Sequence, residues 1–240
     1  MFPNIIVSFM KSATGISDLD KLMTGGFPEN STILLRGSPG TGKSTLCQQF
    51  LISGMGSSQP AIYITLDTSP DEIISNMKRF GNISGHLKNN LMIFLDAYSW
   101  KVGGGKDEEW KKVLQGGLDI NSLNVMLSDI LKKLAEKDKR SVFDSVSTLL
   151  LYIPSDLVVR FIPILIAKCK QARSTQILIL EEGVHDEEIV NTLSYLSDGV
   201  VEMKMEGPKR YMRMSKMKGS SCSHDWIEYR IENKGLSIVA

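Results

Sequence analysis

The stretch Gly37-Ser38-Pro39-Gly40-Thr41-Gly42-Lys43-Ser44 follows an apolar run at residues 32–36 and precedes an apolar-periodic run that begins at Thr45. This order predicts a buried strand, a glycine-rich loop and a helix. Glycines let successive backbone N–H groups turn inward around phosphate oxygens, and the helix N-terminus adds the positive end of its dipole. At this spacing Lys43 reaches the β- and γ-phosphates, and the Ser44 hydroxyl coordinates Mg²⁺. Residues 37–45 therefore predict a P-loop, or Walker A, site for a nucleoside triphosphate.

The bulk composition is that of an ordinary globular protein. The chain has 240 residues, of which 42% are hydrophobic and 23% charged, and its formal net charge is +1. This length suits one α/β domain with a full core, and we expect residues 1–240 to form a single domain. A charge near zero creates no global field toward nucleic acid or an anionic membrane, so binding to either would need a local patch.

Cysteine usage and hydropathy bear on where the protein works. Cys47, Cys169 and Cys222 lie far apart and accompany no histidine cluster, which argues against a disulfide framework and a zinc site. The apolar residues 1–10 lack a basic region and a cleavage site, so they predict an edge strand and no signal peptide. No apolar run reaches the length of a membrane span. We expect a cytoplasmic protein.

Apolar strand-like runs alternate with helical stretches through most of the chain, which predicts a mostly parallel sheet with helices on both faces. The expected strands are residues 32–36, 61–66, 91–95, 141–143 and 176–180, and the expected helices are residues 43–55, 70–80, 122–137 and 155–172. Near the C-terminus the pattern changes to residues 199–205, 210–217, 226–231 and 236–239, which predict antiparallel strands added to one side. The polar, glycine-containing residues 100–117 predict a surface loop, with a partner- or substrate-binding loop as the alternative.

A second candidate element of the nucleotide site follows the strand at residues 141–143. Asp144 comes directly after this strand, and a carboxylate at such a strand end binds Mg²⁺ beside the phosphate loop. The match is weak alone and strong beside the loop. Ser44 and Asp144 are thus the predicted metal ligands.

Several further segments resemble the RecA superfamily, and most of all its KaiC-like ATPases, including the single-domain archaeal members. The likeness runs from Thr14 to the C-terminus. It lies in four segments: Thr14-Gly15-Ile16-Ser17-Asp18-Leu19-Asp20-Lys21-Leu22 with Gly25-Gly26-Phe27-Pro28, Tyr63-Ile64-Thr65-Leu66-Asp67-Thr68-Ser69-Pro70, Phe143-Asp144-Ser145-Val146-Ser147 and Lys216-Met217-Lys218-Gly219-Ser220. The resemblance implies a RecA-like core that binds ATP with Mg²⁺ and hydrolyses it to ADP. It also implies a homo-oligomer such as a hexamer, with the nucleotide at a subunit boundary.

The resemblance makes Asp67, with Lys43, the expected catalytic pair. The family has two adjacent glutamates where this chain has Asp67 and Thr68. Asp is one methylene shorter, so a carboxylate that orients water over the γ-phosphate would sit further back, and misplacement by about 1 Å can cost roughly 10²-fold in rate. The expectation is slow hydrolysis. The alternative for Asp67 is a strand-end carboxylate that caps the following helix.

The resemblance also makes Lys216 and Lys218 candidates for contacting the nucleotide of a neighbouring subunit. Family members often carry Arg where Lys218 stands, and lysine cannot make the bidentate phosphate contact. A solvated strand face is the alternative for both lysines. Cys222 occupies the usual histidine position, two residues before His224, and neither receives a role. Glu181 and Glu182 follow the strand at 176–180, where one of them senses or polarises the γ-phosphate or, as the alternative, both belong to a surface loop.

Three functions remain open from the sequence. The first is an ATPase, and the second is a nucleotide-dependent switch or assembly scaffold with little hydrolysis, which Thr68 favours. The third is a DNA-binding recombination factor, which rests on a local cluster of basic residues. That cluster consists of Lys204, Lys209, Arg210, Arg213, Lys216 and Lys218. No Ser/His/Asp or Cys/His arrangement indicates covalent catalysis.

Overall fold

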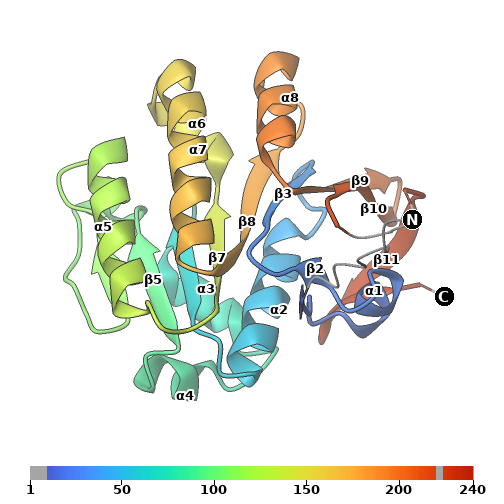
Figure 1. The fold of residues 1–240 in the computed structure, drawn as a ribbon, viewed down its shortest axis with the longest axis horizontal. Helices are drawn as coiled ribbons and strands as arrows, with labels where there is room; N and C mark the ends of the chain where they lie inside the picture. Colours follow the sequence, from blue (N-terminus) through green and yellow to red (C-terminus); the bar gives the residue numbers. More distant parts are fainter. Residues whose placement is uncertain (1–9, 220–223, 240) are drawn as a thin grey trace, which may run out of the picture.

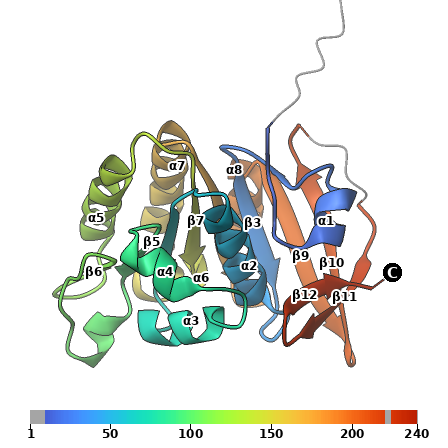
Figure 2. The same cartoon turned by 90° about the horizontal axis from the view of Figure 1, so that it is seen from below.

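Ten strands form one sheet in the order β12-β11-β10-β9-β3-β8-β7-β4-β5-β6. The computed structural model describes residues 10–219 and 224–239 (Figures 1 and 2). The strands of this sheet are β3 (Thr32–Gly37), β4 (Ala61–Thr65), β5 (Met92–Asp96), β6 (Lys111–Val113), β7 (Lys139–Asp144), β8 (Ser174–Glu181), β9 (Gly199–Glu206), β10 (Lys209–Met217), β11 (Ile227–Glu232) and β12 (Gly235–Ile238). A separate two-stranded sheet pairs β1 (Lys11–Ser12) with β2 (Phe27–Pro28).

The sheet is parallel from β9 to β6 and antiparallel beyond β9. Parallel neighbours include β3 with β8 and with β9, β8 with β7, and β7 with β4. The strands β10, β11 and β12 then pair antiparallel in sequence. The central strands are buried along almost their whole length, which explains why they appear in the sequence as continuous apolar runs.

Helices cover both faces of the parallel part. They are α1 (Ser17–Leu22), α2 (Lys43–Gly56), α3 (Pro70–Met77), α4 (Ile83–Lys88), α5 (Ile120–Lys133), α6 (Val146–Tyr152), α7 (Ser155–Gln171) and α8 (Glu187–Leu196). One core cluster joins α1, α2, α3 and α4 to one face of the sheet, and the other joins α5, α6, α7 and α8 to the opposite face. Figure 1 shows α5, α7 and α8 side by side on this second face.

The predicted fold class is confirmed, including the antiparallel strands at the C-terminal side. The predicted helices at 43–55 and 155–172 agree with α2 and α7 to within one residue. The predicted helix at 122–137 instead begins at Ile120, because the Asp119 side chain accepts the backbone N–H of Ser122 at 2.9 Å and caps it. It ends at Lys133, and the predicted helix at 70–80 ends at Met77.

The segment predicted as a loop, residues 100–117, is partly ordered into regular structure. A 3-10 turn covers Ser99–Val102, and β6 pairs with β5 at the outer edge of the sheet. β6 was not predictable from the sequence pattern, because it is three residues long and two of these are lysines. The strand predicted at residues 1–10 lies outside the described residues except for Met10. Among the described residues, no helix is long and apolar enough to cross a membrane.

Candidate nucleotide-binding and catalytic site

Four neighbouring strands bring the predicted site residues to one edge of the sheet. The strands β3, β8, β7 and β4 are consecutive in the sheet and parallel, so their carboxyl ends lie at the same edge. β3 leads into the phosphate loop, β8 ends at Glu181, β7 ends at Asp144 and Asp67 follows β4. Ligands of open α/β sheets bind at this carboxyl edge. The topology thus assembles the loop and the carboxylates from distant parts of the chain.

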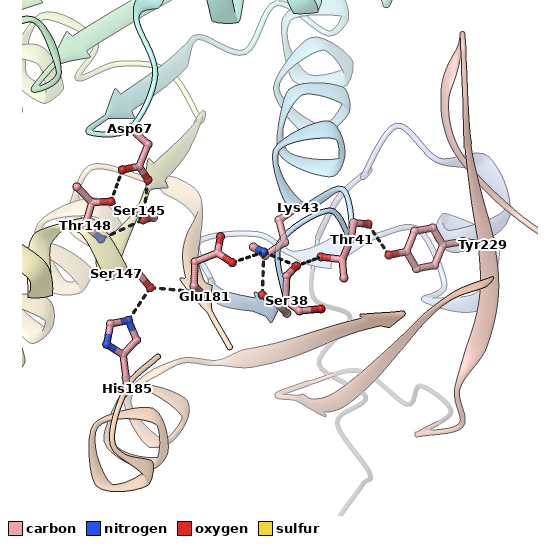
Figure 3. A network of polar contacts seen from close by, with 11 residues as sticks. Ser38, Thr41, Lys43, Asp67, Ser145, Ser147, Thr148, Glu181, His185 and Tyr229 are labelled. Carbon is pink, nitrogen blue, oxygen red and sulfur yellow. Dashed lines mark hydrogen bonds and ion pairs between the residues drawn. The ribbon is translucent and has the colours of Figure 1, made fainter. Parts of the chain in front are cut away.

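The phosphate loop depends on two glycines with positive φ. Gly40 has φ 81° and Gly42 has φ 94°, values that side-chain-bearing residues rarely adopt. A Cβ at Gly42 would also lie 2.3 Å from the Cδ1 atom of Ile231. Within the loop, the Thr41 hydroxyl donates to the Ser38 carbonyl at 2.8 Å. The Tyr229 hydroxyl, from β11, donates to the Thr41 carbonyl (Figure 3), so the C-terminal strands support the loop.

Lys43 is the first residue of α2 and is only 5% exposed. Its ammonium group donates to the carbonyls of Gly37 at 2.8 Å and Ser38 at 3.0 Å. It also donates to Glu181 Oε2 at 2.9 Å (Figure 3). The ammonium is therefore aimed into the loop, and Glu181 is its charged partner. Ser44 follows as an exposed residue in the first turn of α2.

Asp144 ends β7 as a nearly buried carboxylate, 8% exposed. Its Oδ2 atom accepts a hydrogen bond from the Tyr63 hydroxyl at 2.6 Å. The pKa of Asp144 is raised to about 6, mainly by burial and in smaller part by the charges of Asp67 and Glu181, whereas the hydrogen bond from Tyr63 and the charge of Lys43 oppose the shift. The environment thus penalises the Asp144 anion unless a cation compensates it.

Asp67 lies against the first turn of α6. Its Oδ2 atom accepts the Ser145 hydroxyl at 2.8 Å, and its Oδ1 atom accepts the Thr148 hydroxyl (Figure 3). The helix α3 has a different N-cap, because the Ser69 hydroxyl accepts the backbone N–H of Glu72. Asp67 is therefore held beside the β7 strand end, and the capping role considered for it belongs to Ser69.

A second polar group adjoins Glu181. The Ser147 hydroxyl accepts the backbone N–H of Glu181 at 2.8 Å and lies 2.7 Å from Nε2 of His185 (Figure 3). Burial lowers the pKa of His185 from its usual value, which favours the neutral ring. The sequence prediction assigned no role to His185, Ser147, Tyr63 or Tyr229. Nothing in a single sequence marks them, because their contacts depend on strand order.

Lys216 and Lys218 differ in their surroundings. Lys216 donates its ammonium protons to the carbonyls of Ser194, Tyr195 and Ser197 at the C-terminal end of α8. Cations are favoured at this end of a helix. Lys218 is exposed. Ser220 and Cys222 lie outside the described residues, and His224 Nδ1 lies 2.7 Å from the Met214 carbonyl.

The other four cations of the predicted basic cluster all have partners among the described residues. Three of its cations form ion pairs with glutamates: Lys204 with Glu206, Lys209 with Glu228, and Arg213 with Glu202. The Nε atom of Arg210 donates to the Gly40 carbonyl at 3.2 Å. The three glutamates reduce the positive charge that the cluster offers to phosphates of a nucleic acid, although Glu202 is shared with Arg36.

The oxygen atoms at this edge of the sheet suit a hard cation that is bound mainly through a nucleotide. Over residues 10–219 and 224–239, no group of three His, Cys, Asp or Glu side chains could hold a metal ion. Mg²⁺ is commonly bound through one or two protein oxygens together with substrate phosphates. Ser44 lies in the first turn of α2 beside the loop and Asp144 ends β7, so the predicted ligands, a hydroxyl and a carboxylate, are both oxygen donors at this edge.

The family model described as "ATPase: KaiC" matches residues 12–240. The chain belongs to the KaiC ATPase family. This confirms the resemblance inferred from the motifs. Among similar proteins, the UPF0273 protein PF1931 of Pyrococcus furiosus is 31% identical over 237 residues, which cover 94% of this chain and 92% of that protein. A UPF0273 protein of Thermotoga maritima is 29% identical, with 94% of each chain covered.

Two further similar proteins carry KaiC in their names. The circadian clock oscillator protein KaiC of Parathermosynechococcus lividus is 30% identical over 237 residues, which cover 95% of this chain and 42% of that longer protein. A solved structure, the KaiC-like protein PH0186 from Pyrococcus horikoshii, superposes with a TM-score of 0.77 at 20% identity and covers 97% of this chain and 100% of its own. At that identity the superposition supports the fold alone.

Proposed function

We propose that this KaiC-family chain binds Mg-ATP at the loop formed by residues 37–45 and hydrolyses it slowly to ADP and phosphate. The observation that carries the proposal is the convergence of Lys43, Asp144 and Asp67 at the carboxyl ends of neighbouring strands. Family membership supports ATP binding at such a loop. Each group has a distinct role in phosphoryl transfer.

Lys43 and the loop amides bind the β- and γ-phosphates. To do so, the Lys43 ammonium exchanges its contact with Glu181 for phosphate oxygens. The Ser44 hydroxyl and Asp144 would hold Mg²⁺. When bound, the ion neutralises charge that develops on the β- and γ-oxygens. The raised pKa of Asp144 fits this role, because a cation compensates the buried anion.

Asp67 orients the attacking water. A carboxylate offers about four lone-pair sites, so the hydrogen bonds from Ser145 and Thr148 leave sites for a water molecule. Those two hydroxyls fix the direction of the carboxylate. The same bonds tie Asp67 to α6, and its side chain is shorter than the glutamate of the family pattern. Both features favour slow turnover.

We further propose that the nucleotide lies at a boundary between copies of the chain, in a homo-oligomer such as a hexameric ring. Lys218 is the exposed cation that would reach the neighbour's nucleotide. Lys216 would have to leave the carbonyls at the end of α8 to take part. Light scattering that detects only monomer at high concentration with Mg-ATP would contradict this part.

Steady-state phosphate release tests the catalytic assignment. Asp67→Ala should lower turnover by roughly 10²–10⁴, the usual contribution of a positioned base, and leave ATP affinity nearly unchanged. Asp71→Ala, which removes an exposed carboxylate from the first turn of α3, is the matched control. Equal turnover in the wild type and Asp67→Ala would contradict the role of Asp67.

A non-hydrolysing switch is the second candidate, and the double restraint of Asp67 by Ser145 and Thr148 favours it. It predicts wild-type phosphate release at background level with normal nucleotide affinity. The nucleic-acid alternative is weakened by the ion pairs of the basic cluster. It predicts stimulation of phosphate release by single-stranded DNA, which the same assay measures.

A further inference from the structure

Tyr63 is a core tyrosine whose hydroxyl reaches the metal side of the proposed site. It lies in β4 and has no exposed surface, and its ring stacks on Phe94 with a centroid distance of 5.8 Å. A phenylalanine would serve the stacking equally well. The hydroxyl is therefore the atom that needs an explanation, because a buried tyrosine hydroxyl requires a partner. That partner is Asp144 Oδ2, at 2.6 Å.

The register of the sheet makes this contact possible. Tyr63 pairs with Val142 across the β4–β7 ladder, and Thr65 pairs with Asp144. Tyr63 therefore lies two residues, or about 6.6 Å along the strand, before the position that pairs with Asp144, and its side chain lies on the same face of the sheet. A tyrosine side chain spans such a distance, so its hydroxyl reaches the carboxylate from the core side.

The contact occupies one of the two carboxylate oxygens of Asp144. Among the hydrogen bonds of the described residues, only the Tyr63 hydroxyl donates to this carboxylate, and it donates to Oδ2. No hydrogen bond from the described residues reaches Oδ1, so this oxygen can accept a ligand. We infer that Tyr63 is a positioning residue that fixes the Asp144 carboxylate so that Oδ1 can bind the magnesium of the nucleotide complex. The inference rests on the proposed function, in which Asp144 binds that ion.

A purely structural hydroxyl would behave differently from a positioning one. If the hydroxyl only satisfies core polarity, its loss changes the free energy of unfolding and leaves metal affinity alone. If it positions Asp144, its loss lowers the affinity for the metal ion and leaves nucleotide binding without metal unchanged. Partners that orient a metal ligand usually contribute 10- to 100-fold in metal affinity or activity.

The experiment measures the affinity of Tyr63→Phe for a fluorescent, non-hydrolysable ATP analogue, first in EDTA and then across a Mn²⁺ titration. In EDTA the variant should equal the wild type. The Mn²⁺ concentration for the half-maximal gain in affinity should rise by about 10- to 100-fold. Tyr195→Phe is the matched control, because Tyr195 is 82% exposed on α8, and its titration should coincide with the wild type.

A double-mutant cycle separates action through Asp144 from a general loss of packing. In an Asp144→Asn background, Tyr63→Phe should cause no further shift in the Mn²⁺ titration. A Tyr63→Phe titration that coincides with the wild type overturns the inference, as does a shift that persists at full size beside Asp144→Asn. If Tyr63→Phe is poorly folded, the titration is run in sucrose, which favours the compact state. If the nucleotide affinity of the wild type does not depend on Mn²⁺, the proposed function itself is refuted.

Discussion

Glu181→Gln tests whether a carboxylate competes with the phosphates for Lys43. The Lys43 ammonium has three acceptors, and Glu181 is the charged one, at 2.9 Å. A nucleotide must displace this ion pair to reach the ammonium. The Glu181 charge also repels the incoming phosphates. Removing the charge frees the Lys43 ammonium and also removes the repulsion. Both effects raise the affinity for ATP, so the variant should bind ATP more tightly.

The size of the effect follows from the exposure of the two partners. A hydrogen bond to a charged group contributes about 1.5–3 kcal/mol. Lys43 is 5% exposed but the Glu181 side chain is 31% exposed, so solvent screens the pair and reduces its contribution to about 1 kcal/mol. That value corresponds to a roughly fivefold lower Kd.

The assay is the Kd of a fluorescent ATP analogue in EDTA, so that metal binding does not contribute. The control is Glu182→Gln, which makes the same change in net charge one residue away at an exposed position. It should bind like the wild type. An unchanged or higher Kd for Glu181→Gln would refute the competition argument, and so would an equal gain in Glu182→Gln.

Three further variants probe the supports of the site. Tyr229→Phe removes the donor to the Thr41 carbonyl and should raise the Kd for ATP about fivefold with or without Mg²⁺, as checked by the same fluorescence assay; an unchanged Kd would show that the loop needs no support from β11. Asp144→Asn should stabilise the metal-free protein. The pKa of Asp144 is about 6 when folded against an ordinary 3.8, so the carboxyl group favours folding below pH 3.8, and this contribution is lost as the pH rises through 6. Urea denaturation in EDTA should show that Asp144→Asn raises the free energy of unfolding by about 1–3 kcal/mol at pH 7 and not at pH 3.5. The same difference between variant and wild type at both pH values would show that burial does not penalise the anion. Asp67→Glu restores the longer side chain and should speed phosphate release, and a slower rate would show that side-chain length is not the limitation.

Much of the fold was predictable because its central strands and their connecting helices leave simple patterns. Buried parallel strands appear as apolar runs, and the loop at residues 37–44 marks one strand-to-helix junction by its glycines. The short elements left no such pattern. The strand β6 contains two lysines, and α6 follows the β7 strand end directly, within the segment quoted for its Asp144 motif.

The candidate site was predictable only where a motif carries its own chemistry. Lys43, Ser44, Asp144 and Asp67 lie in such motifs. The partners that hold them do not: Glu181 meets Lys43 because β8 lies between β3 and β7, and that order is set by packing over the whole chain. Tyr63 and Tyr229 look like core aromatic residues in the sequence, and only strand register shows where their hydroxyls point.

The most direct test of the account is equilibrium binding of a fluorescent ATP analogue to the wild type and to Lys43→Ala in the presence of Mg²⁺. Lys43 is buried in the loop and its ammonium is aimed at the position proposed for the phosphates. The account predicts binding by the wild type and a loss of about 1.5–3 kcal/mol in Lys43→Ala, which is roughly 10- to 150-fold in Kd. Equal affinity in the two proteins, with Lys43→Ala folded, would contradict the assignment of this loop as the nucleotide site.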